Sequence, residues 1–145
     1  MKSVGKVISL FITDKISNKT KTYPNIILDM KGIQQDKHYD KNNQRSILIS
    51  STESYSLSQA HNIDISFGKL GENILVDFNP YLLPASTKIK INNCILEITQ
   101  GCTLCKHLTS IDNRLPKLLK NDRGIFTKVV QGGEIHVGDD IYIIS

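Results

Sequence analysis

The residues best suited to chemistry in this sequence are two closely spaced cysteines and a nearby histidine, Cys102, Cys105 and His107. A thiolate is the form of cysteine that attacks electrophiles and binds soft metals, and basic neighbours favour that form. Three interpretations are open from the residues alone: half of a zinc site, a redox-active dithiol, and a buried pair without reactivity. A structural zinc site needs four ligands, usually from two paired clusters, and the sequence holds no second pair. A thioredoxin-like dithiol would accompany a βαβ pattern, which is also missing.

A second group of polar residues could bind a phosphate. Asp36, Lys37 and His38 precede Arg45 in a stretch whose Asn-, Asp- and Lys-rich composition, over residues 34–44, predicts a loop. Arginine can bind a phosphate through two parallel N–H bonds, and lysine acts as a point charge. The same residues would also suit a solvated surface loop, so both interpretations stay open.

Two shorter motifs combine glycine with polar side chains. Gly71-Glu72-Asn73 stands directly before an apolar run. Its glycine permits a left-handed backbone, and its asparagine offers both a donor and an acceptor. Asp122-Arg123-Gly124 could simply pair two opposite charges at a turn. Ordinary turn chemistry also explains each motif taken alone.

The elements that must position these residues are mostly short β-strands. Apolar runs separated by turn residues predict strands at residues 4–13, 26–30, 45–50, 71–78 (after a turn), 87–91, 94–99, 125–130 and 140–144. Asn92-Asn93 suits a two-residue hairpin turn, and Gly132-Gly133 a further turn. Two short helices are expected, at residues 51–60, capped by Ser50 or Ser51, and at residues 115–120. This pattern favours a β-barrel or sandwich, and barrel closure would remove exposed strand edges.

Length and composition limit the class of protein. The chain has 145 residues, which suits one domain over residues 1–145. Its 18 basic and 14 acidic residues give a net charge of +4, only three of the basic residues are arginines, and tryptophan is absent. A nucleic-acid-binding protein is therefore not expected. No apolar run approaches the roughly 18 residues of a membrane span, and the first residues lack the apolar core of a secretion signal. With three cysteines, an odd number, these features predict a cytoplasmic protein without a disulfide framework or a membrane partner.

Taken together and in this order, the motifs resemble the MOSC domain family, named for the C-terminal domain of molybdenum cofactor sulfurases. The resemblance covers nearly the whole chain, and the stretch from Leu96 to Ile141 is its most specific part. It is carried by Asp36-Lys37-His38, Arg45 at the start of RSILIS, Gly71-Glu72-Asn73-Ile74, Lys88–Ile91, Leu96-Glu97-Ile98-Thr99, Asp122-Arg123-Gly124-Ile125-Phe126, Val129-Val130-Gln131-Gly132-Gly133 and Ile135-His136-Val137-Gly138-Asp139. The resemblance implies a mainly β fold, a MOSC-type β-barrel with a few short helices.

The resemblance also implies a site for a molybdenum–pterin cofactor. Cys105 matches the cysteine whose thiolate ligates the metal in molybdenum-binding members, and a soft thiolate suits a sulfur-rich molybdenum centre. The cofactor-binding residues implied are His38, Arg45, Ser50, Ser51, Asn73, Thr103, Leu104 and Cys105. Compact relatives often place a glycine before and after the loop at Asp36. Here Gln35, and Tyr39 or Asp40, hold those positions.

The resemblance implies a part in the two-electron reduction of N-hydroxylated compounds. The electrons would come from a separate donor protein, because the chain holds no flavin or iron–sulfur motif. In one alternative, Cys105 carries a persulfide sulfur from a cysteine desulfurase for the maturation of a metal–sulfur or molybdenum cofactor. In a second alternative, the barrel binds a ligand or a protein without catalysis. The chain could form a homodimer.

Overall fold

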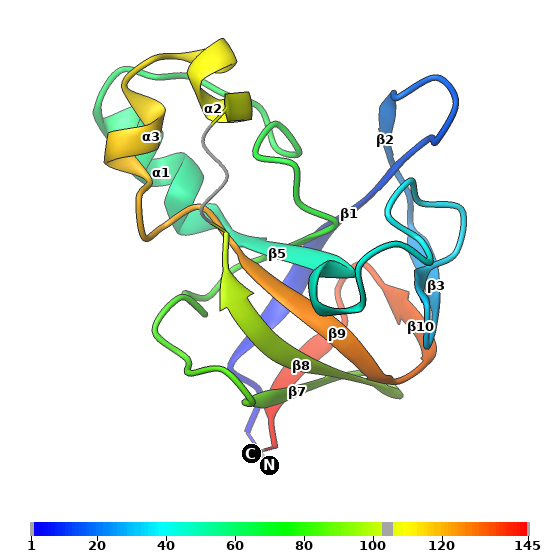
Figure 1. Cartoon of the computed structure of the whole chain (residues 1–145). Helices are drawn as coiled ribbons and strands as arrows, with labels where there is room; N and C mark the ends of the chain where they lie inside the picture. Colours follow the sequence, from blue (N-terminus) through cyan, green and yellow to red (C-terminus); the bar gives the residue numbers. More distant parts are fainter. Residues whose placement is uncertain (1, 103–105, 145) are drawn as a thin grey trace.

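The structure is a computed structural model that describes residues 2–102 and 106–144 (Figure 1). In chain order its strands are β1 (Gly5–Thr13), β2 (Thr20–Thr22), β3 (Asn25–Asp29), β4 (Gly32–Ile33), β5 (Ile47–Ser51), β6 (Ile74–Val76), β7 (Lys88–Ile91), β8 (Cys94–Gly101), β9 (Ile125–Gln131), β10 (Gly133–His136) and β11 (Asp140–Ile143). Its helices are the 3₁₀-helix η1 (Asn43–Arg45) and the α-helices α1 (Thr52–Ala60), α2 (Lys106–Ile111) and α3 (Leu115–Leu118).

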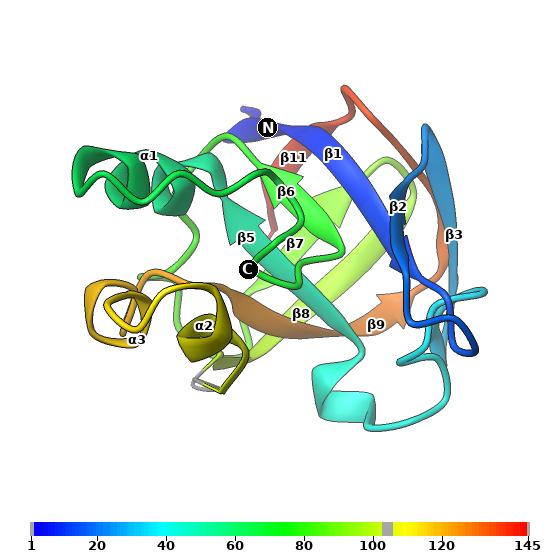
Figure 2. The same ribbon diagram turned by 90° about the horizontal axis from the view of Figure 1, so that it is seen from above.

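Seven strands close into a barrel in the order β1-β11-β7-β8-β9-β5-β6, with β6 returning to β1. Viewed from above, these strands surround the barrel interior (Figure 2). Strands β5 and β6 run parallel, and the other neighbouring pairs in the ring are antiparallel. The closing seam pairs Gly5 with Ile141 and Lys6 with Asp140. The prediction of a mainly β barrel with a few short helices is confirmed.

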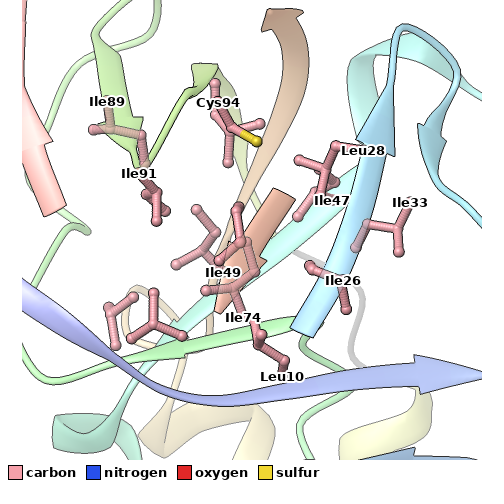
Figure 3. Close-up of a cluster of buried hydrophobic side chains, with 14 of the residues drawn as sticks. Leu10, Ile26, Leu28, Ile33, Ile47, Ile49, Ile74, Ile89, Ile91 and Cys94 are labelled. Carbon is pink, nitrogen blue, oxygen red and sulfur yellow. The ribbon is translucent and has the colours of Figure 1, made fainter. Parts of the chain in front are cut away.

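Apolar side chains contributed by strands around the barrel fill its interior (Figure 3). Burial alternates along β7, where Ile89 and Ile91 face inward and the two lysines face outward, as expected for a strand with one wet face. Strand β5 is instead buried along its whole length. The separate sheet β10-β3-β4 packs Ile26, Leu28, Ile33 and Ile135 into the same core. Cys94 lies in this core at the start of β8, the strand predicted over residues 94–99.

The three α-helices gather at the end of the barrel away from the chain termini (Figure 1), and the view from above shows them together on one side (Figure 2). A second apolar cluster joins them to the barrel wall; it contains Phe11, Tyr55, Ile63, Leu70, Leu75, Leu108, Leu115 and Leu119. Ser51 ends β5 and caps α1, because its hydroxyl accepts the backbone N–H of Glu53 at 3.1 Å. This confirms one of the two predicted caps. Within residues 2–102 and 106–144, no helix is both long and apolar enough to cross a membrane.

Several segments differ from the sequence prediction. Arg45 belongs to η1 and not to the following strand, because the Asn42 side chain accepts the N–H of Gln44 at 3.0 Å and caps a short turn. Gly133 opens strand β10, where a turn alone was expected. Helix α2 is additional to the two predicted α-helices, and strand β2 is additional to the predicted strands. All three residues of β2 are exposed, so no apolar pattern marks this strand.

The loop over residues 34–44 adopts left-handed backbone without glycine. Gln35 has φ 74° and Asp40 has φ 57°, and the family resemblance implies glycine at Gln35 and at Tyr39 or Asp40. A left-handed non-glycine residue costs on the order of 1 kcal/mol, so the surrounding contacts must hold this loop in place.

Candidate functional site

A cavity of about 1040 Å³ opens at the barrel wall and is enclosed by elements distant in sequence. Its lining comes from the end of β1, from β2, from η1 and the start of β5, from loops on either side of these strands, from α2 and from the start of β9. Among the lining residues that the structure describes, five are lysine or arginine, two are histidine and none is acidic. These basic residues are Lys21, Lys37, His38, Arg45, Lys69, His107 and Arg123.

Asp36 holds the loop that carries His38. Its buried carboxylate accepts the backbone N–H groups of Thr13 at 2.9 Å and His38 at 3.1 Å. It also lies 3.3 Å from the amide nitrogen of Asn73 and 3.3 Å from Nδ1 of the His38 ring. Burial raises the pKa of Asp36, but the hydrogen bonds from His38 and Thr13 outweigh it and bring the pKa below its ordinary value. The carboxylate therefore fixes the His38 ring, which lines the cavity with Nε2 free of partners in the described residues.

Asn73 also lines the cavity, and its side chain joins three segments of the chain. Its Oδ1 accepts the N–H of Leu48 at 3.1 Å. Its amide nitrogen donates to the carbonyl of Phe11 and to Asp36, both at 3.3 Å. Both N–H groups of the amide are thus used inside the protein, which leaves a lone pair of Oδ1 for a ligand. The predicted contact between Asn73 and the cofactor stays a prediction.

Arg45 lies across the aromatic ring of Phe126, with the guanidinium carbon 5.4 Å from the ring centroid. Both residues line the cavity. Within the described ranges, no hydrogen bond or ion pair occupies the guanidinium of Arg45. Stacking on an aromatic face holds such a group in place and leaves its N–H edge available for an anion.

Ser50 and Ser51 are fully buried and are not among the described residues that line the cavity. The hydroxyl of Ser50 donates to the carbonyl of Arg123 at 2.7 Å. The backbone N–H of Ser51 donates to the hydroxyl of Tyr81 at 2.8 Å, and its side chain caps α1. In this structure the two serines position β9 and α1, and a direct contact with a cofactor stays a prediction for both.

The cysteine segment begins where β8 ends. Cys102 is buried against Leu48 and Phe126, lines the cavity, and donates its N–H to the carbonyl of Gly124 at 2.9 Å. Thr103, Leu104 and Cys105 lie outside the described residues. Their cofactor contacts, and the roles of Cys105 as metal ligand or persulfide carrier, therefore stay predictions. In the chain as described, no group of three or more His, Cys, Asp or Glu residues could hold a metal ion.

Comparison with protein families decides where the chain belongs. The family model of the MOSC domain matches residues 35–142, a range that includes the Asp36 loop, Asn73 and the cysteine segment. The chain belongs to the MOSC domain family. The resemblance that its motifs carry is thereby confirmed. No curated protein sequence matches this MOSC chain.

Solved structures share the barrel of this MOSC protein. The YuaD protein from Bacillus subtilis superposes with a TM-score of 0.84 at 21% sequence identity, over 94% of this chain and 93% of that chain. YiiM from Geobacillus stearothermophilus superposes with a TM-score of 0.68 at 13% identity, over 99% and 75% of the two chains. YiiM from Escherichia coli superposes with a TM-score of 0.72 at 13% identity, over 97% and 70%. At these identities the comparison shows a shared fold.

Some residues of the MOSC cavity carry no recognisable sequence signal. Lys21 on β2 and Lys69 on a loop both line the cavity. The backbone carbonyl of Lys69 lies 2.8 Å from Nε2 of His107. A single lysine among many predicts nothing, because only the folded hairpin and loop bring it to the cavity. Arg123 also differs from expectation. In place of an ion pair with Asp122, its Nε and Nη2 donate to the carbonyl of Leu70 at 3.3 and 3.1 Å.

Proposed function

We propose that this MOSC domain binds a molybdenum–pterin cofactor in the basic cavity, with the Cys105 thiolate as the metal ligand. The observation that carries the proposal is the charge of the cavity wall. The chain has 18 basic and 14 acidic residues. Five lysine and arginine side chains face the cavity, and no acidic residue of the described lining opposes them. Such a wall favours an anionic ligand, and the phosphate of a pterin cofactor is one.

The other lining residues suit the ring part of such a cofactor. Apolar side chains of Phe11, Leu48, Phe67 and Phe126 line the cavity beside the basic groups. Ligand sites for small molecules combine mostly apolar walls with a few fixed polar groups, commonly in volumes of about 300–1,000 Å³. A volume of about 1040 Å³ is large enough for a pterin with its phosphate. The described residues therefore fit the organic part of the cofactor, and Cys105 is assigned to the metal through the family resemblance.

The reaction in this proposal is the reduction of N-hydroxylated compounds. R–NHOH, two electrons and two protons give R–NH₂ and water, and a separate protein supplies the electrons. When bound, the metal centre of the cofactor supplies the two-electron chemistry. His38 and His107 are the described lining side chains whose ring nitrogens could donate a hydrogen bond or a proton to a bound ligand. Because Nδ1 of His38 is held by Asp36, Nε2 is the atom that would deliver a proton to the cavity.

Cofactor content of the purified chain tests the proposal. The chain is expressed in a host that makes the cofactor, molybdenum is measured by mass spectrometry, and pterin is measured by fluorescence after oxidation. We expect wild type to carry both, Cys105→Ala to lose molybdenum, and Cys94→Ala to keep it, since Cys94 lies in the barrel core. Wild type without molybdenum and pterin, or equal molybdenum in Cys105→Ala, would overturn the proposal.

Arg45 provides a second comparison in the same assay. Loss of a hydrogen bond to a charged group costs about 1.5–3 kcal/mol, or roughly a 10- to 100-fold loss of affinity. We therefore expect Arg45→Gln to lower pterin content. Arg114→Gln is the matched control, because Arg114 is exposed and pairs with Asp112 at 2.8 Å. Equal pterin content in both variants would show that Arg45 does not contribute to binding the cofactor.

A further inference from the structure

Arg123 is a buried cation with an incomplete set of hydrogen bonds. The residue is 6% exposed and lines the cavity. Two of its nitrogens, Nε and Nη2, donate to the single carbonyl oxygen of Leu70. Its third nitrogen, Nη1, is buried and has no hydrogen-bond partner among the described residues. A buried charged donor without a partner is costly, so Nη1 marks a position where a partner is missing.

The surrounding backbone holds the guanidinium in place. The carbonyl of Leu70 belongs to a turn between Gly68 and Gly71, both of which line the cavity and have positive φ, 92° and 89°. The turn is closed by a bond from the N–H of Gly71 to the carbonyl of Gly68 at 3.0 Å. At its other end, the carbonyl of Arg123 accepts the hydroxyl of Ser50 at 2.7 Å. The side chain is therefore positioned before any ligand arrives, which lowers the entropic cost of binding.

The charge of Arg123 is only partly balanced inside the protein. Glu72 is buried, its Oε2 accepts the hydroxyl of Tyr55 at 2.6 Å, and its Oε1 has no partner in the described structure. Burial raises the pKa of Glu72 by more than the Tyr55 hydrogen bond and the Arg123 charge lower it. Burial thus opposes the ionisation that would neutralise Arg123, and no ion pair within 4.0 Å joins the two described side chains.

We propose that Arg123 is the anchor of an oxyanion subsite in this cavity, where Nη1 donates to an oxygen of a phosphate monoester. This subsite rests on the proposed function of the cavity, and it would hold the anionic end of the ligand. From the sequence, Arg123 is explained only as one of two opposite charges at a turn. The stacked Arg45 and the lysines add charge around the cavity, whereas Arg123 is the one basic residue of the described lining that combines burial with an unused donor.

Arginine side-chain NMR of the wild-type chain, residues 1–145, with inorganic phosphate as the probe, tests the inference. The chain has only three arginines, so three Nε–H signals report on Arg45, Arg114 and Arg123. We expect the Arg123 signal to shift and saturate as phosphate replaces chloride at constant ionic strength, while the signal of exposed Arg114 stays in place. An unchanged Arg123 signal, a parallel shift of the Arg114 signal, or saturation at Arg45 alone would overturn the inference.

Variants and the cofactor assay separate this inference from the proposed function. We expect Arg123→Gln to weaken phosphate binding by about tenfold or more, and Arg114→Gln to leave it within about twofold. If Arg123→Gln does not fold, the wild-type titration decides by itself. A chain that carries molybdenum and pterin but shows no phosphate response at Arg123 overturns the subsite alone. A chain that binds phosphate at Arg123 but never carries cofactor retains the subsite and loses the proposed function.

Discussion

Asp36→Asn changes the residue that holds the His38 loop, at nearly constant size. Asparagine keeps one carbonyl oxygen and replaces the second acceptor by an NH₂ group. In wild type, Oδ1 of Asp36 receives bonds from Thr13 and Asn73, and Oδ2 receives both bonds from His38. Whichever way the new amide turns, its NH₂ group faces two donors. Two of the four hydrogen bonds are therefore lost.

The size of the loss follows from these contacts. A hydrogen bond to a charged group contributes about 1.5–3 kcal/mol, so two such bonds correspond to about 3–6 kcal/mol. The His38 side chain is 52% exposed, and water can replace its contact. We therefore expect a loss in the free energy of unfolding near the lower limit, about 3 kcal/mol. In a chain of this length, that loss lowers Tm by about 6–12 °C.

The pH dependence of this difference has a definite sign. Folding lowers the pKa of Asp36. The stabilisation of the fold by the ionised carboxylate is therefore fully present above the unfolded-state pKa of about 3.9, and it disappears as the pH falls through the folded-state pKa. The difference between wild type and Asp36→Asn should therefore be constant from neutral pH down to about pH 5 and shrink at lower pH.

Urea unfolding followed by circular dichroism, with thermal melts over the same pH range, measures this difference. Asp40→Asn is the matched control, because it makes the same chemical change at an exposed position of the same loop. The positive φ of Asp40 suits asparagine equally, so its effect should stay within about 0.5 kcal/mol. A loss no larger for Asp36→Asn than for Asp40→Asn, or a difference that does not shrink at low pH, would refute the reasoning.

Three further predictions concern the core, a close backbone contact and the buried acid. Leu10→Ala, at a fully buried position, should cost about 2–5 kcal/mol in urea unfolding. Leu82→Ala, at a position 93% exposed, should stay within about 0.5 kcal/mol, and similar losses would contradict the assigned core. Gly132→Ala would place a Cβ 2.5 Å from a main-chain oxygen of β3 and should cost about 1–3 kcal/mol in thermal unfolding. Gly101→Ala, whose Cβ meets nothing within 4 Å, should not be destabilised, and equal stabilities would contradict the geometry. Because burial raises the pKa of Glu72, wild type should lose stability relative to Glu72→Gln as the pH rises above about 4.5, and urea curves that stay parallel from pH 4 to 8 would contradict this.

The sequence predicts those strands whose pattern of apolar and polar side chains matches their burial. In β7 the alternation of isoleucine and lysine indicates which face is buried, and Asn92, with φ 54°, provides the left-handed turn into β8. Strand β2 has no such pattern. Its exposed residues are a strand only because Thr20–Thr22 pair with the end of β1, and that pairing depends on the folded hairpin.

In the candidate site, too, some features follow from the sequence and others depend on the folded structure. His38, Arg45 and Asn73 belong to recognisable motifs, and all three line the cavity. Ser50 and Ser51 belong to one as well, but both side chains are satisfied inside the protein, because a fully buried strand must pair every polar group it carries. The distinction depends on which face of β5 meets another element. Local sequence does not contain that information.

The seam between β1 and β11 sets a condition on synthesis. These two strands lie near opposite ends of the described chain, and their pairing closes the ring. While a ribosome is still making β11, the nascent sheet has two open edges, on β7 and on the start of β1, and such edges readily pair with other chains. Closure therefore waits until Ile143 has left the exit tunnel. A translation stop before Asp140 would release an open sheet prone to aggregation, because without β11 neither β7 nor the start of β1 has a strand to pair with.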